Sequence, residues 1–259
     1  MTALSGQILA TARAFASALI PGTCALCGLH APEPICRHCA TSCFGRPVPR
    51  CPCCAIALPP TPAANRHDAG PPAAGNHCPA CTADPPAFDA TVAAADYAPP
   101  CDQLALALKF GGRLPLAGAI ARRLIDAILA DARGAALMPD LLVPVPLGPR
   151  RLAQRGYNQA LEIARPLSSA LGLPLAGRLV VRGHDTEAQA RLPLAARRGN
   201  MRGAFALAPD SRDTVAGRHV GVVDDVMTTG ATLDALAMSL KAHGARRVTN
   251  FVFARTPRP

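Results

Sequence analysis

The later two thirds of the chain alternates between short apolar runs and longer segments with helical periodicity. The apolar runs predict strands over the following ranges: Phe88–Tyr97, Leu141–Val145, Leu179–Arg182, His219–Val223 and Arg247–Ala254. The helical periodicity predicts helices over four ranges: Cys101–Phe110, Leu114–Leu129, Gly156–Leu171 and Ala231–Ala242. Strands that alternate with helices form a parallel sheet with helices on both faces. The pattern therefore predicts an α/β domain over residues 87–259.

The first 86 residues follow a different pattern. Apolar residues recur at helical spacing between residues 3 and 20, which predicts an amphipathic helix within residues 1–23. A signal peptide is the alternative, but the segment lacks a basic start and Arg13 interrupts its apolar run. Residues 24–86 are rich in cysteine and form a predicted metal-binding module. Inside this module, the Pro-, Ala- and Gly-rich insert Leu58–Gly75 predicts a mobile loop.

All 11 cysteines lie between Cys24 and Cys101. Eight of them form four C-x-x-C pairs: Cys24/Cys27, Cys36/Cys39, Cys51/Cys54 and Cys78/Cys81. Two intervening residues let both sulfurs face one ion, so the spacing predicts two structural Zn²⁺ sites of four cysteines each rather than a disulfide framework. Sequential pairing places the first two pairs on one ion and the last two on the other. Interleaved pairing is the alternative, and the spacing does not choose between them.

Three cysteines remain outside the pairs. Cys53 is an alternative ligand to its neighbour Cys54, whereas Cys43 and Cys101 are expected to be small buried apolar residues. Zinc thiolates require a reducing compartment, so we expect a cytoplasmic protein. No apolar run approaches the roughly 20 residues that a membrane span needs.

The most informative stretch runs from Val222 to Thr232. A strand of apolar residues leads into two acids, which are expected to follow the strand, then into a loop of Thr and Gly residues and a predicted helix. A helix N-terminus with free N–H groups binds phosphate, and such junctions are where ligands bind in α/β sheets. Two acids beside a phosphate cradle suit ribose hydroxyls with Mg²⁺ nearby. The stretch therefore predicts a site for a ribose 5-phosphate.

The charge of the chain fits a polyanionic ligand. Net charge is +10, and 25 of the 27 basic residues are Arg, the side chain that binds phosphate as a planar fork. Candidate pyrophosphate or substrate contacts follow the predicted strands and helices: Lys109, Pro146, Leu147, Arg151 and Arg155. Residues 191–202, which include Arg197 and Arg198, predict a loop that closes over the site. Tyr157 is the one candidate shelf for an aromatic base.

The sequence Val222–Leu233 resembles the phosphoribosyl pyrophosphate (PRPP) signature of type I phosphoribosyltransferases. The resemblance implies that Asp224 and Asp225 bind the ribose hydroxyls. It implies that the following residues hold the 5-phosphate: Val226, Met227, Thr228, Thr229, Gly230, Ala231 and Thr232.

The whole chain is similar to the ComF/GntX family. The resemblance rests on the cysteine pairs and on three further motifs: ALKFGGR (107–113), VPVPLGPRRLAQRGYNQA (143–160) and VVDDVMTTGATL (222–233). It implies a zinc ribbon in front of a phosphoribosyltransferase-like domain that binds PRPP with Mg²⁺. If the protein is an enzyme, it transfers the phosphoribosyl group to an acceptor that the sequence does not identify. The alternative is a competence factor without catalysis that binds single-stranded DNA or competence-machinery proteins, with PRPP as ligand or regulator.

Overall fold

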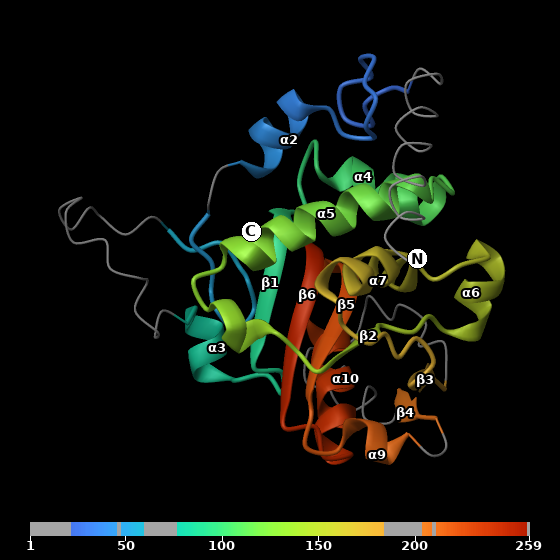
Figure 1. Ribbon diagram of the computed structural model, residues 1–259. Coiled ribbons are helices and arrows are strands. Elements are labelled where there is room, and N and C mark those ends of the chain that lie inside the picture. Colours follow the sequence, from blue (N-terminus) through green and yellow to red (C-terminus); the bar gives the residue numbers. More distant parts are fainter. Residues whose placement is uncertain (1–21, 46–47, 60–76, 184–203, 209–210, 258–259) are drawn as a thin grey trace, which may run out of the picture. The chain divides into compact units, whose positions relative to one another are not determined.

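The computed structural model describes residues 22–45, 48–59, 77–183, 204–208 and 211–257 (Figure 1). The chain divides into two compact units, Met1–Pro47 and Val48–Pro259, and each is described by itself. Three predicted features lie wholly or mostly outside the described residues: the helix over 3–20, the insert over 58–75 and the loop over 191–202.

In the first unit, the described residues form a turn followed by one helix. Thr23 and His30 form an antiparallel bridge across the turn, and helix α2 (Arg37–Phe44) begins directly after Cys36. Ala31 and Ile35 are the only buried apolar residues besides cysteine between residues 22 and 45. So small a core does not order a chain unaided, and a metal cross-link suits a module of this size.

The second unit is built on a parallel sheet with the strand order β1-β6-β5-β2. Its strands are β1 (Ala90–Asp96), β2 (Leu141–Pro144), β5 (His219–Met227) and β6 (Arg247–Arg255). The two central strands are buried almost throughout, as expected for a sheet covered on both faces. Phe251 and Phe253 of β6 are fully buried in its core.

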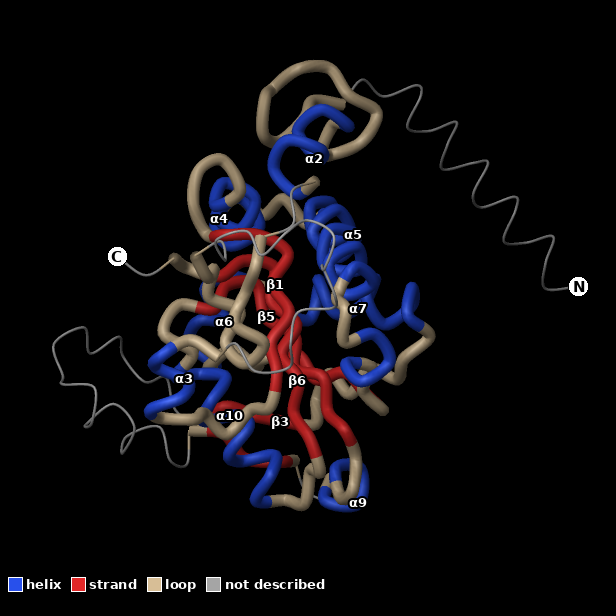
Figure 2. Tube along the Cα trace, turned by 90° about the vertical axis from the view of Figure 1, so that its left-hand side faces the viewer, coloured by secondary structure: helices blue, strands red, loops and turns tan. Residues whose placement is uncertain are grey.

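Helices cover both faces of the sheet. Helices α5 (Pro115–Ala130) and α7 (Gln159–Leu171) pack together, α5 on β1 and β6 and α7 on β5 and β2. Helix α10 (Ala231–Ala242) lies on the opposite face against β6 (Figure 2). The remaining helices are α3 (Pro79–Ala83), α4 (Asp102–Phe110), η1 (Gly134–Leu137), α6 (Pro149–Arg155) and α9 (Arg212–Val215). The predicted parallel sheet with helices on both faces is confirmed.

Two local predictions need correction, and one helix was not predicted. The acids Asp224 and Asp225 lie within β5 rather than after it, because the strand stays paired with β6 as far as Met227. Residues 149–155 form helix α6, which apolar periodicity did not reveal because none of its residues is buried. The strand near residue 180 is β3 (Val180–Arg182), and it pairs antiparallel with β4 (Phe205–Leu207) in a separate ribbon.

Candidate functional site

A cavity of about 730 Å³ lies at the carboxyl ends of β2 and β5. The segment after β2 and the end of α4 line it, as do α6, the start of α7 and Arg182 of β3. This is the edge of a parallel sheet where ligands bind, because the loops that leave the strands converge there.

The acid pair forms the floor of this cavity. Asp225 is only 2% exposed, and its Oδ2 atom pairs with Lys109 Nζ at 2.7 Å. The side-chain amide of Gln159 lies 3.4 Å from the other carboxylate oxygen. Restricted access to water and the neighbouring charge of Asp225 raise the pKa of Asp224, while Lys109 acts in the opposite direction. A ligand that donates hydrogen bonds or carries positive charge would relieve this crowding of two acids.

The loop after β5 has the backbone form of an anion cradle. Gly230 adopts φ +88° as the residue before α10, and a Cβ atom there would lie 2.7 Å from Met227 Cε. A side chain is therefore strained at this position. Thr228 and Thr229 are exposed, and the Ala231 N–H approaches the Thr229 hydroxyl at 3.3 Å. The first N–H groups of the 12-residue α10 have no carbonyl partner within the helix, so they can bind an anion.

The residues Gly156–Gln159 tie the helices around the cavity together. Gly156 ends α6 at φ +80°, and the Asn158 side chain begins α7 by accepting the Ala160 N–H at 3.0 Å. Asn158 also donates to the Val145 carbonyl at 3.0 Å. The Tyr157 hydroxyl donates to the Leu108 carbonyl, one residue before Lys109. Tyr157 thus positions the helix that carries Lys109.

An exposed aromatic residue lies beside these groups. Phe110 is 76% exposed and lines the cavity, and the Arg155 guanidinium carbon lies 5.6 Å from the centre of its ring. Arg155 also donates to the Gln159 side-chain oxygen, which links it through Gln159 to Asp225. Phe110 is therefore better placed than Tyr157 to receive a flat ligand group.

The structure brings together most of the residues predicted for the ligand site. Those that line the cavity are Lys109, Pro146, Leu147, Arg151, Arg155, Asp224, Asp225, Val226 and Thr232. The remaining predicted residues, Met227–Ala231, run from the end of β5 through the adjoining loop to the start of α10 without lining the cavity. Reasoning from sequence missed six lining residues: Phe110, Gly112, Val145, Gln154, Gln159 and Arg182. Phe110 lies within the motif 107–113 and Gln159 within the motif 143–160, and this position is the signal in the sequence that indicates them.

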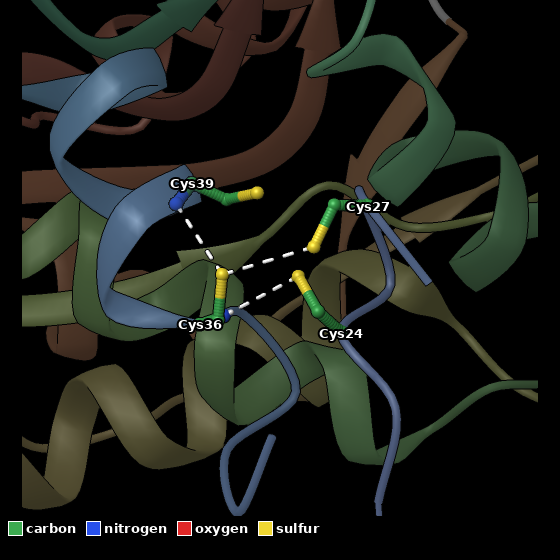
Figure 3. Close-up of side chains that lie close together, drawn as sticks. All are labelled: Cys24, Cys27, Cys36 and Cys39. Atoms are coloured by element: carbon green, nitrogen blue, oxygen red, sulfur yellow. Dashed lines mark hydrogen bonds between the residues drawn. The ribbon is translucent and has the colours of Figure 1, made fainter. Parts of the chain in front are cut away.

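The first four-cysteine group lies in the first unit (Figure 3). Its sulfurs, from Cys24, Cys27, Cys36 and Cys39, lie within 4.8 Å of one another. The Cys36 N–H donates to Cys24 Sγ at 3.3 Å, and the Cys39 N–H donates to Cys36 Sγ at 3.4 Å. Burial raises the pKa of Cys24, but the N–H groups around its sulfur outweigh burial and lower it to about 6. Sulfurs gathered in this way and supplied with N–H donors fit a thiolate-bound metal ion.

The second group lies in the second unit and comprises Cys51, Cys54, Cys78 and Cys81. All four are buried, and their sulfurs also lie within 4.8 Å of one another. The Cys78 N–H donates to Cys51 Sγ at 3.3 Å, which repeats the geometry of the first group. A hydrogen bond from the Cys54 thiol, aided by backbone N–H groups, lowers the pKa of Cys51 to about 4. The two groups follow the sequential pairing rather than the interleaved one.

The three remaining cysteines lie outside both groups. Cys53 is buried but not part of the second group, and burial raises its pKa to about 11. Cys101 is buried as expected, whereas Cys43 is half-buried. The structure thus places Cys54, not Cys53, among the candidate ligands.

Among the helices that the structure describes, none combines the length and apolar character needed to cross a membrane.

Known proteins resemble this chain over nearly its whole length. Residues 157–259 match the family model described as "Phosphoribosyl transferase domain". The "DNA utilization protein YhgH" of Salmonella typhimurium is 35% identical over 241 residues, covering 92% of this chain and 98% of that protein. "Competence protein F" of Haemophilus influenzae is 34% identical over 180 residues, covering 69% and 78%. A solved purine phosphoribosyltransferase from Pyrococcus horikoshii matches with a TM-score of 0.27 and 19% identity, covering 54% and 69%.

The cysteine groups precede the sheet in the chain, and the matched domain includes β5, the acid pair and the loop before α10. This order agrees with the motifs that resemble the ComF/GntX family. The chain belongs to the family that contains the DNA utilization protein YhgH and competence protein F.

Proposed function

We propose that this protein binds PRPP in the cavity at the carboxyl ends of β2 and β5, as a phosphoribosyltransferase-like member of its family. The observation that carries the proposal is one cavity lined by the acid pair and several cationic side chains, with the glycine loop before α10 adjoining it. PRPP has a ribose with two free hydroxyls between a phosphate and a pyrophosphate. The site therefore offers a matching group for each of these three parts of PRPP.

Each part of PRPP is assigned to a different element. The N–H groups at the start of α10 and the hydroxyls of Thr228, Thr229 and Thr232 hold the 5-phosphate. The carboxylates of Asp224 and Asp225 accept hydrogen bonds from the ribose hydroxyls. The cations that line the cavity, Lys109, Arg151 and Arg155, face the pyrophosphate.

Mg²⁺ fits the same chemistry, because carboxylate and phosphate oxygens are the ligands that it prefers. Asp224 and Asp225 are the residues of this chain that would hold it together with the pyrophosphate. When bound, Mg²⁺ supplies positive charge that stabilises the leaving group.

In a transfer reaction, the bond from ribose C1 to pyrophosphate breaks and an acceptor forms a new bond to C1. The residues of this chain then act by orientation and by charge. The loop and acid pair fix the ribose, while Lys109 and the arginines stabilise the charge that develops on the pyrophosphate. The exposed ring of Phe110 offers a surface for a flat acceptor.

We further propose that each four-cysteine group binds one structural Zn²⁺. The support is the tetrad of sulfurs within 4.8 Å and the N–H···S hydrogen bonds in both groups. Zinc-bound thiolates need a reducing compartment, so we place the protein in the cytoplasm. The predicted division into a helix (1–23), a zinc ribbon (24–86) and a phosphoribosyltransferase-like domain (87–259) belongs to this proposal.

The binding proposal is tested by calorimetry with PRPP and Mg²⁺. Asp225→Asn keeps the shape of the side chain but removes its charge, so affinity should fall about 10- to 150-fold, the worth of a hydrogen bond to a charged group. The matched control is Asp89→Asn. Asp89 also pairs with a lysine, Lys241 at 2.9 Å, but it lies at the other end of the sheet. Equal PRPP affinity in the two variants would contradict the assignment of the site.

The loop is tested separately with Gly230→Val. A branched side chain at φ +88° both strains the backbone and fills the space that the phosphate must approach, so binding should be lost. Thermal unfolding of the same variant separates loss of the cradle from loss of the fold. If Gly230→Val keeps full affinity, the phosphate lies elsewhere.

A competence factor that does not catalyse transfer is the second candidate function. The names of the relatives, "DNA utilization protein" and "Competence protein F", favour it, as does the net charge of +10. Release of pyrophosphate in the presence of cell extract would support transfer, and PRPP binding without release would support the second function. If single-stranded DNA binds to α6, replacing Arg150, Arg151 and Arg155 should flatten the dependence of affinity on salt.

A further inference from the structure

Three arginines fasten the metal-binding turn Cys51–Ala55 to the sheet. Three carbonyl oxygens of the turn each accept a hydrogen bond from a different guanidinium group: Pro52 from Arg133 at 2.6 Å, Cys54 from Arg255 at 2.9 Å, and Ala55 from Arg50 at 3.1 Å. The turn directs N–H groups towards its sulfurs, so its carbonyls need donors from elsewhere when they are buried.

Arg255 differs from the other two arginines in its remaining hydrogen-bond partners. Arg50 and Arg133 make their other hydrogen bonds with Asp96, Asp131 and the Thr91 carbonyl. Arg255 instead donates through Nη1 to the carbonyl of its neighbour Thr256, at 3.0 Å, and to the carbonyls of Met227, at 3.1 Å, and Thr228. These two residues begin the phosphate loop. One guanidinium group therefore bridges the second cysteine group and the candidate PRPP site.

The bridge is buried and rigid. Arg255 is 3% exposed, and it is the last residue of β6, where it is in register with Met227. A guanidinium group is planar, so its donors keep a fixed geometry relative to one another. A shift of the Cys54 carbonyl then requires Arg255 to turn or to lose a hydrogen bond, and either change alters the support of the loop.

We propose that Arg255 is a positioning residue that couples zinc in the second cysteine group to PRPP affinity. With zinc bound, the turn holds Arg255 where it fixes the carbonyls of Met227 and Thr228, and the loop keeps its phosphate-binding form. Without zinc, this support is lost and PRPP binds more weakly. The inference rests on the proposed PRPP site and adds a regulator of that site, namely the metal state of the cysteines.

The first test compares Arg255→Gln with Arg50→Gln. Both variants remove one guanidinium from the metal-binding turn, but only Arg255 also contacts the phosphate loop. Calorimetry with PRPP and Mg²⁺ should show affinity about 10-fold weaker in Arg255→Gln, the lower range for a hydrogen bond to a charged group. Arg50→Gln should bind PRPP as the wild type does. Hydrogen exchange of amides 228–232 should speed up only in Arg255→Gln.

The second test uses reciprocity and needs no change at Arg255. If zinc strengthens PRPP binding, PRPP must strengthen zinc binding by the same factor. Cys27→Ser removes a ligand of the first group, so zinc release to a chelator from this variant reports on the second group. At equilibrium with the chelator, PRPP should lower the fraction of zinc released when Arg255 is present, and should have no effect when Arg255→Gln is added.

The outcomes separate this inference from the proposed function. If wild-type protein does not bind PRPP, the proposed function fails. If it binds PRPP but Arg255→Gln binds equally well, the coupling alone is overturned. If Arg255→Gln does not fold, the release experiment decides, and an equilibrium fraction of released zinc that is the same with and without PRPP overturns the coupling.

Discussion

The two four-cysteine groups share their spacing but differ in their surroundings. In both, the N–H of the third cysteine donates to the sulfur of the first at 3.3 Å. The first group lies among few buried apolar residues, and Cys27 is exposed. The second group has four buried cysteines and belongs to the same apolar cluster as Phe88 and the sheet residues Val143 and Val222.

A cysteine motif determines its local geometry, whereas the residues around it determine how it joins the rest of the protein. The C-x-x-C spacing sets the turn and the N–H···S hydrogen bonds, which are alike in both groups. The residues around the motif decide whether the metal site is a small module of its own or part of a larger core. The second group is part of the core because apolar residues and three arginines attach it to the sheet.

The largest expected effect is the difference in stability between a variant that lacks a ligand of the second group and one that lacks a ligand of the first. Cys54→Ser should destabilise the second unit severely, because a structural zinc contributes on the order of 10 kcal/mol and its ligands here lie in the core. Cys27→Ser should lower the zinc content without changing the unfolding temperature of the second unit. Elemental analysis and calorimetric unfolding measure both. Similar unfolding temperatures in the two variants would remove the distinction between the groups.

Metal removal should distinguish the groups by rate. A chelator reaches the first group through the exposed Cys27, but it reaches the second group, whose four cysteines are buried, only when the core opens. We expect two phases of zinc release from wild-type protein, with one equivalent in the fast phase. Cys27→Ser should lack the fast phase. A single phase of two equivalents would indicate that the groups open together.

Substitution of Cys53 tests which cysteines bind the metal ion of the second group. Cys53→Ser should leave the zinc content unchanged and lower stability by about 1 kcal/mol, since it places a hydroxyl in a buried position. Cys51→Ser should lower the zinc content by about one ion per chain. A loss of zinc in Cys53→Ser would show that Cys53 replaces Cys54 as a ligand.

The smallest expected effect is on the unfolding free energy at acidic pH. Burial and the nearby charge of Arg247 lower the pKa of His219 below its usual 6.5, so His219 is neutral in the folded sheet. The unfolded chain binds the proton more readily, so this contribution to stability is present above pH 6.5 and is lost as pH falls towards the lower, folded pKa. His219→Gln should therefore reduce the pH dependence of the unfolding free energy below pH 6.5. An unchanged slope would contradict the assignment to His219.

The effect of acid also bears on the comparison. The second group shares its core with the sheet, so weakening of the sheet should promote zinc loss from it as well. The first group lies in a different unit, and its zinc loss should be the same in His219→Gln and in the wild type.

The architecture of the second unit could be predicted from sequence because its signals are local. Apolar runs in the sequence predict β1, β2, β5 and β6, and the helical periodicity of apolar residues predicts α5 and α10. Helix α6 escaped prediction because it buries no residue, although Pro149 at its start and Gly156 after its end are typical helix signals. The strand β4 escaped because its three residues are too few to show alternation.

The site could be predicted in part for the same reason. Asp224, Asp225 and Gly230 follow one another in a motif, so their chemistry was visible in the sequence. The partners of Asp225 come from elsewhere in the chain, Lys109 more than 100 residues earlier and Gln159 from the start of α7. Arg255 lies at the end of an apolar strand and gave no sign that its side chain reaches Cys54. Such contacts depend on tertiary packing, which periodicity does not report.

The close approach of Cys54 and Cys78 has a consequence for how this chain can change in length. Their sulfurs lie 3.6 Å apart although the residues are 24 positions apart, so a shared ion would pin both ends of the connection between them. Doubling the length of a connection closed in this way costs only about 0.6 kcal/mol of chain entropy. With both ends pinned by an ion, a change in the length of this stretch is expected to cost little stability, so a fluorescent reporter could be inserted there. The metal cross-link would make this part of the chain a site that tolerates insertions.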